Sequence, residues 1–211
     1  MVVVFDLDDT LYPEMDYVRS AYRAIARRYG ADLLPRMLAA PNAREAFDST
    51  GIDINEILDI YRTHKPDIKL PWQSLYVLES LRLAGNIIGL VTDGRSVTQR
   101  NKIEALGLEH FLRPDLIMIS EEVGSGKISG EAFNRIATET KGESRYIYIG
   151  DNPEKDFIAP NGLGWLTIEV KRGGNGENIF SQKNEELSMP YRPKIIIEQL
   201  TELQGVINCY G

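Results

Sequence analysis

The hydrophobic pattern divides the chain into an initial strand, a helical block and a series of alternating elements. Residues 2–5 form the apolar run Val-Val-Val-Phe, which predicts a buried parallel strand. Between about residues 14 and 84 the apolar positions recur with helical spacing. A first helix in this block presents one apolar face and can end at Gly30. That face comprises Val18, Ala21, Tyr22, Ile25 and Tyr29.

The rest of the helical block predicts shorter helices near 31–39, 42–49 and 54–63, and Asn42 is placed to cap the second of them. Pro66 and Pro71 interrupt the pattern, because the residue before a proline is disfavoured in a helix. A helix over about 72–84 then ends at Gly85. Since no strand is predicted within 14–70, we interpret this segment as a helical cap domain. It is inserted into a core domain formed by residues 1–13 and 71–211.

The second half of the chain alternates between strands and helices. Strands are predicted at Ile87–Val91, Leu116–Ile119, Tyr146–Ile149 and Trp165–Val170, and helices near 95–106, 129–140 and 153–159, the last with Asn152 as its cap. This alternation predicts an α/β fold with a parallel sheet. Residues 171–192 have little periodicity, which predicts either a mobile loop or a tail held against the rest of the protein. A short final helix is predicted near 193–203.

Composition and charge narrow the class of protein. The 211 residues carry a formal net charge of -7, which argues against a general nucleic-acid binder or a binder of anionic membranes. We expect no membrane span, because no apolar run approaches the ~18 residues that one requires. The first apolar run is also too short for a signal peptide. The single cysteine, Cys209, cannot form an internal disulfide, which fits a reducing, cytoplasmic location.

Polar residues with catalytic potential follow four of the predicted strands. Asp6, Asp8 and Thr10 follow the first strand, Thr92-Asp93-Gly94 the second, Lys127 the third, and Asp151 and Asp156 the fourth. Ligands of open parallel sheets bind at the carboxyl ends of the strands. We therefore expect these side chains to meet at one edge of the sheet.

The first pair of carboxylates implies a metal ion, an acid/base pair, or both. Asp6 and Asp8 are two residues apart on an extended chain and can point the same way. Two like charges so close raise each other's pKa, so the pair requires a cation nearby or a proton to share.

The whole set of residue types suits phosphoryl transfer. Asp6 can attack phosphorus, and Mg2+ can be held by Asp6 and Asp151, with Asp156 holding a metal-bound water. The Thr92 hydroxyl, the Lys127 ammonium and the backbone N–H groups of Asp93-Gly94 can bind phosphate oxygens. Asp8 would then give a proton to the leaving oxygen and later take one from water.

These residues, in this order and spacing, resemble the four motifs of the haloacid dehalogenase-like hydrolase superfamily. The motifs are residues 5–11 (Phe-Asp-Leu-Asp-Asp-Thr-Leu), residues 90–94 (Leu-Val-Thr-Asp-Gly), Lys127, and residues 149–156 (Ile-Gly-Asp-Asn-Pro-Glu-Lys-Asp). The resemblance covers about residues 2 to 160 and implies a Rossmann-like parallel sheet flanked by helices. The inserted helical block resembles the C1 cap of that superfamily.

The resemblance also implies roles for individual residues. Asp6 corresponds to the nucleophile and Asp8 to the general acid/base, and Mg2+ is bound by Asp6, the backbone carbonyl of Asp8, and Asp151. The second carboxylate favours a phosphatase over a true dehalogenase, and Thr10 favours a phosphatase over a hexose-phosphate mutase. One departure is Ile128, which follows Lys127 where members of the superfamily often have proline.

Each motif also has a purely structural interpretation. The Asp6 and Asp8 pair can form a solvated turn, Thr92 can cap a helix, and Asp156 can favour a helix N-terminus by its charge. Two other functions stay open: a phosphosugar mutase that uses the same aspartyl-phosphate, and a phospho-accepting signalling module. The expected partner is a small phosphorylated metabolite, whose identity the sequence leaves open. The expected state is a monomer or a homodimer.

Overall fold

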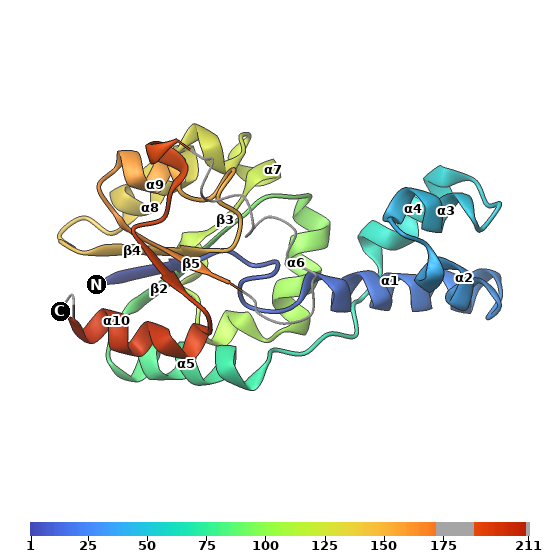
Figure 1. Ribbon diagram of the computed structural model, residues 1–211, viewed down its shortest axis with the longest axis horizontal. Coiled ribbons are helices and arrows are strands. Elements are labelled where there is room, and N and C mark those ends of the chain that lie inside the picture. The colour runs from blue at the N-terminus through green and yellow to red at the C-terminus, as the bar shows by residue number, and fades with distance from the viewer. Residues whose placement is uncertain (172–187, 210–211) are drawn as a thin grey trace.

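The computed structural model describes residues 1–171 and 188–209, and its centre is a parallel sheet with helices on both faces (Figure 1). The strand order is β3-β2-β1-β4-β5-β6, and every recorded pairing is parallel. The strands are β1 (Val2–Phe5), β2 (Ile87–Thr92), β3 (Ile117–Ile119), β4 (Tyr146–Gly150), β5 (Leu166–Val170) and β6 (Ile195–Ile197). The predicted α/β class with a Rossmann-like parallel sheet is confirmed.

Strand β1 lies in the middle of the sheet and is buried on both faces. Val2 pairs with Ile87 of β2 on one side and with Tyr146 of β4 on the other. Val3 and Phe5 pack in one apolar cluster, and Val2 and Val4 pack in another, because successive side chains of a strand point to opposite faces. This explains why β1 is a continuous apolar run rather than an alternating one.

Helices cover both faces of the sheet. They are α5 (Trp72–Leu83), α6 (Ser96–Ala105), α7 (Ser120–Val123), α8 (Glu131–Glu139), α9 (Ile158–Gly162) and α10 (Leu203–Cys209). Figure 1 shows α8 and α9 above the sheet and α5 and α10 below it. Among the described helices, none combines the length and the apolar character that crossing a bilayer demands.

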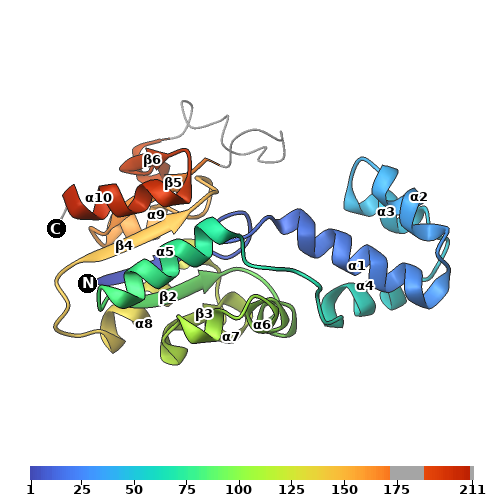
Figure 2. The same ribbon diagram turned by 90° about the horizontal axis from the view of Figure 1, so that it is seen from below.

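The segment after β1 contains four further helices, which extend away from the sheet (Figures 1 and 2). They are α1 (Glu14–Tyr29), α2 (Leu33–Ala39), α3 (Ala43–Asp48) and α4 (Ile54–Thr63). They share an apolar cluster of their own, which includes Tyr22, Ile25 and Ile57. Gly30 ends α1 with a positive φ of 142°, and the Asn42 side chain accepts a hydrogen bond from the Glu45 N–H at 3.0 Å. The boundaries between a cap domain and a core domain stay a prediction.

The predicted helix over 153–159 is wrong. Residues 153–155 form a turn and residues 156–157 a bend, and α9 begins only at Ile158. The Asn152 side chain accepts from the Glu154 N–H at 3.1 Å, and the Asn152 carbonyl accepts from the Asp156 N–H at 2.9 Å. These bonds close a turn of the kind that Asn before Pro favours. Asp156 therefore lies in this turn and not one turn inside a helix.

The predicted helix over 193–203 is also wrong in its first part. Ile195–Ile197 form β6, which pairs with β5, and helix α10 begins only at Leu203. Three consecutive β-branched residues favour a strand over a helix. Of the irregular segment 171–192, residues 172–187 lie outside the described residues, and Met189–Tyr191 form a short 3₁₀ helix.

Candidate active site

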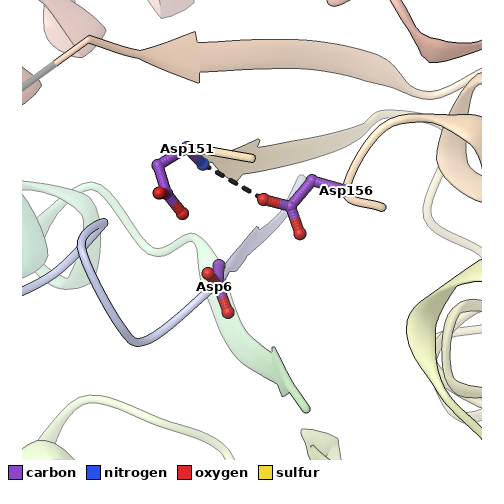
Figure 3. A group of neighbouring side chains, drawn as sticks. All are labelled: Asp6, Asp151 and Asp156. Atoms are coloured by element: carbon purple, nitrogen blue, oxygen red, sulfur yellow. Dashed lines mark hydrogen bonds between the residues drawn. The ribbon is translucent and has the colours of Figure 1, made fainter. Parts of the chain in front are cut away.

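The expected convergence of carboxylates occurs at the carboxyl ends of β1 and β4 (Figure 3). Asp6 directly follows β1 and Asp151 directly follows β4, and these two strands are neighbours in the sheet. One carboxylate oxygen from each of Asp6, Asp151 and Asp156 lies within 4.8 Å of the other two. All three residues are buried. The fold thus brings together three acidic residues that are far apart in the sequence, Asp6 on one side and Asp151 and Asp156 on the other.

Lys127 joins this carboxylate cluster from a different part of the chain. It begins a short 3₁₀ helix, Lys127–Ser129, and it is 2% exposed. Its Nζ lies 2.6 Å from Asp6 Oδ1 and 2.7 Å from Asp156 Oδ1. The Asp93 carboxylate accepts from the Lys127 backbone N–H at 3.1 Å. The side chain of Asp93 therefore holds the Lys127 loop in place.

Asp156 uses both of its oxygens within the protein. Oδ1 accepts from Lys127 and, at 3.2 Å, from the Tyr148 hydroxyl. Oδ2 accepts from the backbone N–H groups of Asp151 at 3.1 Å and Asn152 at 2.8 Å. Two donors at each oxygen match the lone pairs that a carboxylate offers. Asp156 thus orients both Lys127 and the backbone that carries Asp151.

Asp8 belongs to a separate ion pair. Both of its oxygens lie 2.8 Å from Nζ of Lys102, and Oδ1 also accepts from the Tyr12 hydroxyl at 2.5 Å. The side-chain amide of Gln99 donates to Oδ2 at 3.1 Å. Asp6 and Asp8 are therefore paired with different lysines, Lys127 for Asp6 and Lys102 for Asp8.

The second motif is tied to Asp8 by Gln99. The Gln99 amide donates to the Thr92 hydroxyl at 2.6 Å as well as to Asp8. The Gly94 N–H donates to the Ser120 hydroxyl at 2.9 Å. Thr10, from the first motif, donates to Asp151 Oδ1 at 3.3 Å. The predicted phosphate-binding roles of Thr92, Asp93, Gly94 and Lys127 stay predictions.

Gln99 and Lys102 are site residues that the sequence reasoning missed. Both are buried in the structure, although their residue types are usually exposed. A signal was present, because Gln99, Lys102, Ile103 and Leu106 follow the spacing of one helical face. Two of these four positions are apolar and face the core. Polar residues that share such a face must be buried with it.

Burial and mutual repulsion raise the pKa of two carboxyl groups of the cluster. Burial raises the pKa of Asp6 to about 7, against the attraction of Lys127 and with a further rise from Asp156. Burial and the charges of Asp6 and Asp156 raise the pKa of Asp151 to about 9. Burial alone would lower the pKa of Lys127, but Asp156 and Asp6 raise it well above its ordinary value. Full ionisation of the cluster would therefore leave an excess of negative charge, which the raised pKa values of Asp6 and Asp151 oppose.

The pKa of Asp8 moves in the opposite direction. Burial pushes it upward, but the ammonium of Lys102 and the hydrogen bonds from Lys102, Tyr12 and Gln99 outweigh that effect. The net result is a pKa below the ordinary value. Asp8 is thus held as an anion, in contrast to Asp6 and Asp151.

The carboxylate cluster fits a hard divalent cation. When ionised, its three carboxylates exceed the one ammonium of Lys127 by two charges. Carboxylate oxygens are the ligands that Mg2+ prefers, one or two of them for each ion. Each Asp156 oxygen already accepts two hydrogen bonds from protein groups, whereas Asp6 and Asp151 come from adjacent strands and lie beside each other. These last two residues are the natural ligands.

Residues 3–170 match the model of the haloacid dehalogenase-like hydrolase family. The protein belongs to this family, as the four motifs indicated.

Two relatives of similar length are named as phosphatases. The chain is 28% identical over 206 residues to the glyceraldehyde 3-phosphate phosphatase of Methanopyrus kandleri, an alignment that covers 81% of this chain and 84% of that protein. It is also 28% identical over 174 residues to the phosphoserine phosphatase of Thermus thermophilus, covering 77% of this chain and 69% of that one.

Solved structures share the fold at lower identity. The HAD-hydrolase YfnB of Bacillus subtilis, solved with bound magnesium, superposes with a TM-score of 0.68 at 19% identity, covering 98% of each chain. The L-2-haloacid dehalogenase of Xanthobacter autotrophicus gives a TM-score of 0.68 at 14% identity, covering 100% of this chain and 99% of that one. Because the identities are low, these likenesses establish the fold alone.

A substitution at Gly150 tests whether activity depends on the position of the Asp156 carboxylate. A Cβ at this position would lie 2.5 Å from Asp156 Oδ2 and 2.8 Å from its Cγ. Gly150→Ala must therefore displace the carboxylate that orients Lys127, and we expect catalytic turnover to fall about 100-fold, as for other small misplacements of a catalytic group. The matched control is Gly162→Ala, where a Cβ meets no atom within 4 Å. Turnover by Gly150→Ala equal to that of the control would contradict the role of Asp156.

The raised pKa values predict how stability depends on pH when metal is chelated. In the folded protein the carboxyl groups of Asp6 and Asp151 keep their protons over a pH range in which the unfolded chain releases them, because an aspartate has an ordinary pKa of 3.8. Their contribution to stability is thus full below about pH 4 and is lost as the pH rises toward 7 to 9. We expect the melting temperature of the wild type in EDTA to fall more steeply between about pH 5 and pH 9 than that of Asp151→Asn. Equal slopes for the two proteins would be evidence against the raised pKa of Asp151.

Proposed function

We propose that this protein is a Mg2+-dependent phosphatase that hydrolyses a small phosphomonoester through an aspartyl-phosphate on Asp6. The observation that carries the proposal is the position of Asp6. Its carboxylate lies at the end of the central strand, 2.6 Å from the Lys127 ammonium and within the acidic cluster. A nucleophile next to a fixed cation, beside a candidate metal site, is the arrangement that an attack on phosphorus requires.

The reaction would proceed in two displacements. In the first, an oxygen of Asp6 bonds to phosphorus and the bond from phosphorus to the leaving oxygen breaks. Asp8, which rests as an anion, must first take up a proton from solvent, and it then gives that proton to the leaving oxygen. In the second, a water oxygen bonds to phosphorus while Asp8 takes the proton of that water. The bond from phosphorus to Asp6 then breaks and releases phosphate.

Three kinds of donor would bind the phosphate group: an ammonium, a hydroxyl and backbone N–H groups. The Lys127 ammonium reaches the Asp6 carboxylate and can stabilise the phosphate oxygens beside it. The Thr92 hydroxyl, held by Gln99, and the backbone N–H of Asp93 would supply further donors. The Gly94 N–H, also predicted as a donor, already donates to the Ser120 hydroxyl at 2.9 Å and would have to leave that partner first. The glycine at 94 has a φ of 146°, a conformation that side-chain-bearing residues rarely adopt.

Asp6, Asp151 and the backbone carbonyl of Asp8 would hold the Mg2+ ion. Bound there, the ion offsets the repulsion between the carboxylates and an incoming phosphate dianion. Asp156 would keep its contacts with Lys127 and with the backbone of residues 151 and 152, and so hold Asp151 in place.

The relatives named above support a phosphorylated metabolite as substrate. Glyceraldehyde 3-phosphate phosphatase and phosphoserine phosphatase are named for small phosphomonoesters. The helices α1 to α4 would form the cap domain that closes over the substrate and excludes water. A cytoplasmic location and a monomeric or homodimeric state stay predictions from the sequence.

Asp6→Asn tests the nucleophile. Because the amide cannot form the acyl-phosphate, we expect release of phosphate to fall at least about 10³-fold, with an unchanged circular dichroism spectrum. The assay is a panel of small phosphomonoesters and one aryl phosphate with Mg2+, scored by free phosphate. The control is Asp67→Asn, which changes an exposed aspartate outside the acidic cluster. Full activity of Asp6→Asn would eliminate this mechanism, and conversion of a substrate without free phosphate would select the mutase alternative.

Removal of the metal is a separate test. We expect EDTA to abolish phosphate release by the wild type and added Mg2+ to restore it, because the cluster cannot accept a phosphate dianion while its own charge is uncompensated. Asp151→Asn should require a much higher Mg2+ concentration for half-maximal activity, since one ligand has lost its charge. Activity that is indifferent to EDTA and to excess Mg2+ would refute the proposed role of the acidic cluster.

A further inference from the structure

Lys102 is a buried cation that the proposed mechanism leaves without a role. It lies in α6, is 4% exposed, and places its Nζ 2.8 Å from each oxygen of Asp8. The ammonium also lies over the ring of Tyr17, with 4.4 Å between Nζ and the ring centroid. A lysine is seldom buried to this extent unless it is paired.

The contacts around Asp8 fix the orientation of its carboxylate. Oδ1 accepts from Lys102 and from the Tyr12 hydroxyl, and Oδ2 accepts from Lys102 and from the Gln99 amide. Lys102 is the group that contacts both oxygens, so it restrains rotation of the carboxylate plane. Tyr12 and Gln99 each restrain one oxygen.

The helix that carries Lys102 is itself anchored to the helical segment. The Thr98 hydroxyl donates to the Arg62 carbonyl at 3.0 Å, and the Asn101 amide donates to the Thr63 and His64 carbonyls at 3.2 Å each. These carbonyls belong to the end of α4. Tyr17, which packs on the Lys102 ammonium, donates from its hydroxyl to the Tyr61 carbonyl in α4. Lys102 thus reaches Asp8 from α6, which packs in the apolar cluster against the sheet and is hydrogen-bonded to residues 62–64.

We propose that Lys102 is a positioning residue that holds the Asp8 carboxylate where it exchanges a proton with the reacting oxygen. This inference rests on the proposed phosphatase function. The alternative is that Lys102 only balances the charge of Asp8, and then any loss on its removal would come from an altered fold or weaker substrate binding.

The two displacements depend on Asp8 to different degrees when the leaving group is good. An aryl oxygen leaves without needing a proton, so the first displacement can proceed with a misplaced Asp8. The second displacement always needs a base for the attacking water, whatever the leaving group was. A misplaced Asp8 should therefore slow the second displacement selectively. A general loss of structure would slow both.

Rapid mixing of the Mg2+-loaded enzyme with an aryl phosphate separates the two displacements. Release of the aryl alcohol in the first turnover reports the first one, and the steady-state rate reports the second. For Lys102→Met we expect the ratio of the first-turnover rate to the steady-state rate to rise about 10- to 100-fold over that of the wild type. The control is Lys69→Met, which removes an exposed lysine outside the site and should leave the ratio unchanged.

Lys102→Arg keeps the positive charge. It is the variant to measure if Lys102→Met does not fold. Its longer, planar group cannot occupy the same position, so the ratio should rise in this variant as well, by a smaller factor. Circular dichroism melting curves check that each variant is folded.

The possible results are distinct. A raised ratio in folded Lys102 variants supports the positioning role. An unchanged ratio, whether both rates fall together or neither falls, overturns it while the wild-type activity still supports the phosphatase. A wild-type enzyme and a Lys69→Met control that release no phosphate from any phosphomonoester would overturn the proposed function itself and, with it, the role of Lys102.

Discussion

The ammonium of Lys127, buried between Asp6 and Asp156, is the contact on which the rest of the site depends. It lies 2.6 Å from one carboxylate and 2.7 Å from the other, and the whole group is excluded from water. One ammonium cannot balance three carboxylates within 4.8 Å of one another. The remaining charge is what makes this end of the sheet suited to a divalent cation and a phosphate group. Burial, together with the charges of Asp6 and Asp156, raises the pKa of Asp151.

The parts of the site that lie at strand ends could be predicted from the sequence. The apolar run of β1 requires a central, doubly covered strand, so Asp6 must emerge at the carboxyl edge of the sheet. The same reasoning places Asp151 after β4, and adjacency of β1 and β4 then brings the two together. Lys127 was expected at this edge because it follows the third predicted strand, and its Nζ lies 2.6 Å from Asp6 Oδ1. Its role in binding phosphate stays a prediction.

Other parts depend on tertiary contacts that no local pattern reveals. The turn at residues 153–157 is closed by Asp156, whose carboxylate binds backbone N–H groups of the same loop, so a helix start and this turn look alike in sequence. Strand β6 exists because β5 offers it an edge to pair with. The burial of Gln99 and Lys102 could have been predicted from the helical face that they share with Ile103, but their partner Asp8 could not. These residues show that long polar side chains on an apolar face are candidates for buried ion pairs.

The most direct test of the central claim is a crystal structure of the protein grown with Mn2+ in place of Mg2+. The anomalous signal of the ion reports its position independently of the protein atoms. The account predicts one peak in contact with carboxylate oxygens of Asp6 and Asp151, with Asp156 still bound to Lys127 and to the backbone of residues 151 and 152. A peak that contacts Asp156 directly in place of Asp151, or no peak at this end of the sheet, would contradict it.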